Sequence, residues 1–82
     1  MGLKKLAAKV IDYNERLENG QASEIKPLHV EKVLEKLRSK STELEVEIAS
    51  AKSADKKTRL ESKLQIARTH IERAEWLLKE LN

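Results

Sequence analysis

Two stretches with the same periodicity decide the fold of this chain. Residues 30–51 read VEKVLEKLRSKSTELEVEIASA, and residues 60–81 read LESKLQIARTHIERAEWLLKEL. In both stretches, apolar or small residues recur at alternating steps of four and three, which is the heptad pattern of a coiled coil. The seam positions are Val30, Leu34, Leu37, Ser41, Leu44, Ile48 and Ala51, followed by Leu60, Leu64, Ala67, Ile71, Ala74, Leu78 and Leu81. The pattern predicts two long helices that pack along these seams.

A short turn near Asp55 would make the two helices antiparallel neighbours. The resulting register sets large side chains against small ones in several layers, for example Leu37 against Ala74, as close packing favours. This register follows from the seam residues alone, so the flanking charges test it independently. Opposite charges face each other in four pairs: Arg38 with Glu75, Glu45 with Arg68, Lys52 with Glu61, and Glu47 with Lys63.

A third apolar stripe lies near the start of the chain, at Leu3, Leu6, Ala7, Val10, Ile11 and Leu17. Asn19-Gly20 is a good helix stop, because glycine adopts the left-handed conformation freely. Pro27 suits the first residue of the next helix. Ser53, Asp55 or Thr58 can cap the last helix, and Thr58 with Glu61 has capping-box spacing. We expect helices over residues 3–19, 27–51 and 56–81, in one domain spanning 1–82.

The first helix is too short to cover the whole hairpin. It spans about 25 Å against about 37 Å for the second helix. Val33 and Leu77 place apolar side chains beside the seam at the open end, where the first helix can bury its stripe. The sequence therefore predicts an all-α fold. It is an antiparallel coiled-coil hairpin with a shorter N-terminal helix docked on its open end, forming a three-helix bundle.

Composition argues against catalysis and against metal or cofactor binding. The chain has no Cys, and its two glycines form no phosphate-binding loop. His29 and His70 lie on different helices and lack the paired spacing of a helical metal site. We therefore expect no enzyme, no cofactor and no small-molecule substrate. No apolar run approaches the ~20 residues of a membrane span, and no signal peptide is visible, so we expect a cytoplasmic protein.

A small non-catalytic adaptor that binds another protein is the best functional hypothesis. Trp is enriched at the energetic centres of interfaces, and the chain has a single Trp, at position 76. The candidate partner-binding residues are Trp76, Arg73, Tyr13 and Val46. Val46 should lie on the outer face near the hairpin tip, where it stays exposed or meets a second copy in a homodimer.

The alternative is a nucleic-acid-binding regulator that uses the hairpin tip. Residues 52–63 carry five positive and two negative side chains, a net +3 that equals the formal net charge of the chain. Such a patch can contact phosphates or an acidic protein surface. It contains no aromatic residue for base stacking. The tip cations are Lys52, Lys56, Lys57, Arg59 and Lys63.

Overall fold

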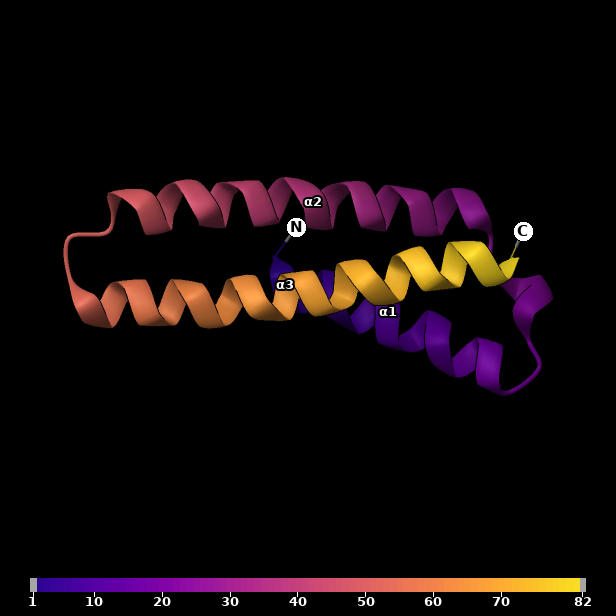
Figure 1. The fold of residues 1–82 in the computed structure, drawn as a ribbon. Coiled ribbons are helices and arrows are strands. Elements are labelled where there is room, and N and C mark those ends of the chain that lie inside the picture. The colour runs from indigo at the N-terminus through magenta and orange to yellow at the C-terminus, as the bar shows by residue number, and fades with distance from the viewer. Residues whose placement is uncertain (1, 82) are drawn as a thin grey trace.

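The computed structural model describes residues 2–81 as a helical hairpin with a third, shorter helix packed on it (Figure 1). In chain order the elements are α1 (Leu3–Glu18), the 3-10 helix η1 (Ala22–Glu24), α2 (Pro27–Ser50) and α3 (Ala54–Leu81). α2 and α3 share the largest interface, and α1 packs against both. The predicted all-α three-helix bundle with a hairpin is confirmed. Coiled-coil supercoiling of the hairpin stays a prediction.

α1 begins halfway along the hairpin and runs toward its open end, parallel to α3 and antiparallel to α2 (Figure 1). It ends at Glu18, one residue before the predicted end, and the predicted stop at Asn19-Gly20 follows it. Gly20 has a φ of 74°, in the left-handed region, and the Gln21 N–H donates to the Arg16 carbonyl oxygen at 2.8 Å. This bond closes the last turn as in a Schellman motif. Pro27 is the first residue of α2, also as predicted.

The start of α3 differs from the prediction. The helix begins at Ala54 instead of residue 56, because Ser53 is its cap: the Lys56 N–H donates to Ser53 Oγ at 3.2 Å. The Thr58 hydroxyl donates to the Ala54 carbonyl oxygen inside the helix, so the predicted Thr58 capping box is not used. Because α2 ends at Ser50, a link of residues 51–53 is enough to reverse the chain.

The hairpin register is confirmed by two of the four predicted ion pairs. Arg38 Nη2 lies 2.9 Å from Glu75 Oε2, and Arg68 Nη2 lies 3.2 Å from Glu45 Oε1. All fourteen seam positions are buried or half-buried. The other two pairs, Lys52–Glu61 and Glu47–Lys63, are not formed within residues 2–81. Lys52 lies in the link beyond the end of α2. The heptad register that would place it opposite Glu61 therefore no longer applies to it.

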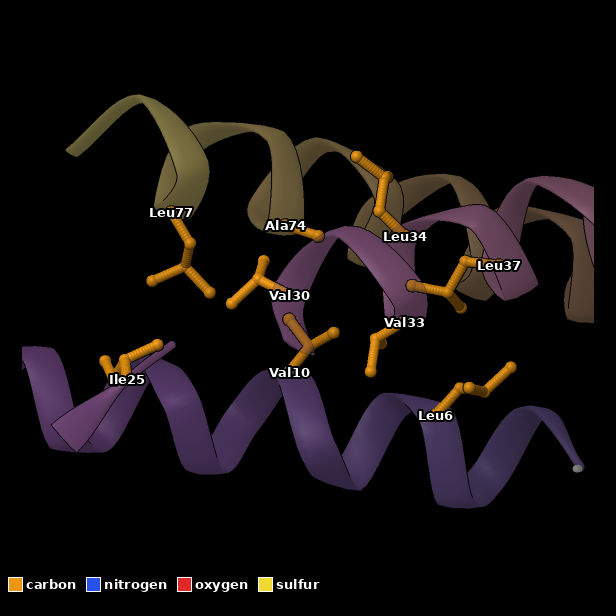
Figure 2. Packing of buried hydrophobic residues seen from close by; sticks show 9 residues of the cluster. All are labelled: Leu6, Val10, Ile25, Val30, Val33, Leu34, Leu37, Ala74 and Leu77. Atoms are coloured by element: carbon orange, nitrogen blue, oxygen red, sulfur yellow. The ribbon is translucent and has the colours of Figure 1, made fainter. Parts of the chain in front are cut away.

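The core consists of two clusters. The open-end cluster joins all three helices and holds Leu6, Val10, Ile25, Val30, Val33, Leu34, Leu37, Ala74 and Leu77. Figure 2 shows Leu6 and Val10 pointing from α1 toward the hairpin. Ile25, in the link between α1 and α2, is 3% exposed. The tip cluster holds Leu44, Leu60, Leu64 and Ala67. Leu3 packs against both clusters, so α1 covers the open half of the hairpin and reaches the tip cluster with its first residues.

Docking of α1 creates two flanks along its length, one facing α3 and one facing α2. The side chains that line these flanks are those beside the buried stripe of α1, so they are partly exposed.

Nowhere between residues 2 and 81 does a helix combine the length and apolarity that crossing a membrane requires.

Candidate functional site: the Trp76 groove

The flank between α1 and α3 contains a shallow groove of about 340 Å³ near the open end of the hairpin. We call it the Trp76 groove. Its lining residues are Asn14 and Glu18 from α1, and Glu72, Arg73 and Trp76 from α3. It contains the only Trp of the chain.

Helical spacing explains how these residues meet. Residues three or four apart lie on one face of a helix, which aligns Asn14 with Glu18 and groups Glu72 and Arg73 with Trp76. Asn14 Nδ2 donates to Glu18 Oε1 at 3.4 Å along that face. The parallel course of α1 and α3 then sets the two faces beside each other over the whole groove.

Trp76 is held in place by its neighbours in the chain while remaining accessible itself. Ala74 and Leu77 are both fully buried, which fixes the rotation of α3 about its axis. Trp76 then projects to the edge of the core and keeps 46% of its surface exposed. The groove therefore presents a half-exposed aromatic side chain on a helix whose rotation is fixed by the core.

The charged side chains around Trp76 have both signs. The negative charges outnumber the positive one, so the groove favours a cationic group on a partner. Glu18 and Glu72 contribute two carboxylates, and Arg73 contributes one guanidinium. None of these three belongs to an ion pair within the described part of the chain. They are free to pair with charges on a binding partner.

His70 lies one helical turn before Arg73 and is half-buried. Its Nδ1 atom is buried and has no hydrogen-bond partner in residues 2–81. Burial lowers the pKa of His70 below its ordinary value of 6.5, and the positive charge of Arg73 lowers it further. The imidazole is therefore neutral at pH 7 and fits its place at the boundary of the core.

The four predicted partner-binding residues do not form one site. Trp76 and Arg73 lie together in the groove. Tyr13 lies on the opposite flank of α1, beside α2. Val46 is 64% exposed on the tip half of α2 and does not line the groove. The five tip cations, Lys52, Lys56, Lys57, Arg59 and Lys63, are all exposed, and none forms an ion pair within residues 2–81.

Sequence reasoning missed Asn14, Glu18 and Glu72. Their helical spacing is visible in the sequence, but the rotation of α1 on the hairpin decides which of its two flanks faces α3. Only Ala74, Leu77 and the buried stripe of α1 fix that rotation.

The lining of the groove offers an indole, an amide, two carboxylates and a guanidinium. Across the described residues, no three His, Asp or Glu side chains are grouped closely enough to hold a metal ion. No protein family, curated protein or solved structure matches this chain. Its function must therefore be inferred from the chemistry of its surface.

Proposed function

We propose that this protein is a small non-catalytic interaction module that binds a protein partner through the Trp76 groove. The observation that carries the proposal is the half-exposed Trp76 in a groove between two packed helices, α1 and α3. An indole in such a position offers a large apolar surface and one N–H donor at small entropic cost, as binding hot spots do.

The groove also suggests the chemistry of its partner. An apolar side chain would pack on the indole, and a neighbouring Lys or Arg would pair with Glu18 or Glu72. Truncating a hot-spot Trp costs about 2 kcal/mol or more, which corresponds to roughly 30-fold in affinity. Rim charges contribute less to affinity and more to the association rate.

The test compares Trp76→Ala with Val46→Ala, since both remove an exposed apolar side chain and only Trp76 lies in the groove. Tagged forms of both variants and the wild type are used to capture proteins from a lysate of the source cell, with and without nuclease. The retained protein is then purified and titrated by calorimetry. We expect Trp76→Ala to weaken binding roughly 30-fold and Val46→Ala to bind as the wild type does.

Equal affinity of both variants and the wild type would rule out the groove as the binding site. Light scattering on the free protein provides a control for self-association. A dimer that Trp76→Ala dissociates would show that a second copy, rather than another protein, occupies the groove.

A second candidate is nucleic-acid binding by the hairpin tip, favoured by the exposure and lack of ion pairs of its five cations. Lys56→Glu combined with Lys57→Glu should then abolish retention of nucleic acid in the samples without nuclease. Retention unchanged by this double variant would exclude the tip.

A further inference from the structure

The flank of α1 that faces α2 differs from the Trp76 groove. It contains a shallow cavity of about 230 Å³, which we call the basic groove. The residues that line it are Lys9 and Tyr13 from α1, and His29, Lys32, Val33 and Lys36 from α2. None of these lining residues is acidic.

Helix geometry gathers these basic side chains from two distant parts of the sequence. Lys9 and Tyr13 are four residues apart on α1, and His29, Lys32 and Lys36 share one face of α2. The antiparallel course of α1 and α2 places the two faces together. Val33, which is 4% exposed, points from α2 toward α1 and contributes to the apolar floor of the cavity (Figure 2).

The basic groove concentrates positive charge. Lys9, Lys32 and Lys36 bring three ammonium groups to one cavity, a local charge as large as the formal net charge of the chain, +3. All three are exposed, and none forms an ion pair with another described residue. Like charges held close together repel each other, so an anion bound between them is stabilised.

The positive surface continues beyond this cavity. Lys4, Lys40 and Lys63 line the neighbouring cavity of about 640 Å³ at the start of α1, together with one carboxylate, Glu47, and the exposed Ile66. Lys40 Nζ is 3.8 Å from Glu43 Oε2, the only carboxylate paired with these lysines within residues 2–81. A ligand with several anionic groups in a row therefore matches this flank better than a single anion does.

Tyr13 points to the class of anion. It is half-buried, packs against the open-end cluster and lines the basic groove with its remaining surface. Proteins that bind single strands combine a cationic groove for the backbone with an aromatic side chain on which a base stacks. The tip, residues 52–63, has the cations but no aromatic side chain.

We propose that the basic groove binds single-stranded nucleic acid. Lys9, Lys32 and Lys36 contact successive phosphates, and an unpaired base stacks on the exposed part of Tyr13. This site is separate from the Trp76 groove and does not depend on the protein-binding role proposed for it. An anionic membrane fits less well, because membrane-surface binding buries apolar side chains. None of the exposed large apolar residues lines the basic groove; they are Ile11, Leu28, Val46, Ile66 and Trp76.

Fluorescence anisotropy of a labelled single strand of about 12 nucleotides, a typical site size, tests the proposal. With three phosphate contacts, affinity should fall roughly 20-fold between about 50 and 200 mM salt. Lys32→Glu should weaken binding about tenfold, because it removes one contact and adds a repulsive charge. Lys79→Glu is the matched control, since it makes the same charge change at an exposed lysine of α3 that lies outside the basic groove and outside the tip. It should bind within about twofold of the wild type, as it leaves all three proposed phosphate contacts in place.

Tyr13 provides a second, independent test. Loss of one base stack weakens binding at least about fivefold, so Tyr13→Leu should show that loss while Tyr13→Phe binds normally. Both replacements keep an apolar side chain against the core, and thermal melting checks that both variants fold. Trp76→Ala should bind the strand as the wild type does, which separates this site from the protein-binding groove.

Three outcomes would overturn the proposal. Equal weakening by Lys32→Glu and Lys79→Glu would mean that binding follows overall charge. Equal binding by Tyr13→Leu and Tyr13→Phe would exclude the proposed base stack on Tyr13 and would indicate a site for anions in general. Sedimentation of the protein with phosphatidylserine vesicles, lost in Lys32→Glu, together with no binding to the strand, would assign the groove to a membrane surface instead.

Discussion

The two flanks of α1 present different chemistry although one helix forms both. Toward α3, the Trp76 groove has an aromatic side chain, two carboxylates and one guanidinium. Toward α2, the basic groove has three lysines, a histidine and Tyr13. Both depend on the docking of α1, because the hairpin alone supplies only one wall of each. A short helix whose buried stripe is fixed by Leu6 and Val10 thus defines two sites with its remaining faces.

Undocking α1 should produce the largest effect on both flanks. Leu6 is 1% exposed in the open-end cluster, so Leu6→Ala should cost about 2–5 kcal/mol of unfolding free energy. Binding at both grooves should weaken together. Urea unfolding followed by the fluorescence of Trp76 measures the change. The matched control is Ile11→Ala on the same helix, whose side chain is half-exposed; it should cost about 0.5 kcal/mol or less.

A core change outside both grooves should separate stability from binding. Leu44 is 2% exposed in the tip cluster, so Leu44→Ala should also cost about 2–5 kcal/mol. Val46→Ala should lower the free energy of unfolding far less, because Val46 is exposed. Under conditions where Leu44→Ala is folded, both grooves should bind normally. Equal destabilisation by the two variants, measured by urea unfolding, would mean that the hairpin register is wrong.

Breaking an ion pair on the hairpin should have a smaller effect. Arg38 and Glu75 lie 2.9 Å apart and both are more than half exposed, so Glu75→Gln should cost less than about 1 kcal/mol. The loss should shrink further in high salt, because exposed charges are screened. Thermal melting at low and high salt provides the measurement. A loss as large as that of Leu44→Ala would contradict this picture of an exposed pair.

The smallest predicted effect is the loss of stability on acidification that His70 causes. Its pKa is lowered by burial and then by Arg73, and the hairpin register places Lys40 opposite it on α2. The unfolded chain therefore binds a proton more readily than the folded protein. The contribution of His70 to the free energy of unfolding is complete above its ordinary pKa of 6.5. This contribution is lost as the pH falls through 6.5 toward the lower pKa of the folded protein.

His70→Leu removes this dependence. Between about pH 7.5 and 5.5, where His is the main titrating side chain, the wild type should lose more stability than the variant. Urea unfolding at both pH values makes the comparison. Identical pH dependence of the two proteins would show that His70 is protonated equally well in the folded and unfolded states.

Much of the hairpin could be predicted from sequence because the heptad pattern is redundant. Fourteen seam positions and the charge pairs Arg38–Glu75 and Glu45–Arg68 point to the same register. The limits of the helices depend on single residues instead. Ser53 competes with Asp55 and Thr58 as a cap, and the sequence does not rank them. Ile25 stands alone among polar neighbours, so no periodicity marks it as buried.

The candidate sites were harder to predict, since each combines two helices. The tip cations are close in the chain and were easily recognised. Lys9 is far in sequence from Lys32 and Lys36, so their convergence depends on the direction and rotation of α1. The same uncertainty grouped Tyr13 with Trp76, although α1 separates them.

The difference between the two flanks is tested most directly by amide chemical-shift mapping of the full chain with a labelled single strand of about 12 nucleotides. Tryptophan has an indole N–H, and this chain has only one, so Trp76 reports on its own groove in the same spectrum. We predict shifts at Lys9, Tyr13, Lys32 and Lys36, with the indole signal unmoved. Shifts concentrated at Lys56 and Lys57, or a moving indole signal, would contradict the assignment of different ligands to the two flanks of α1.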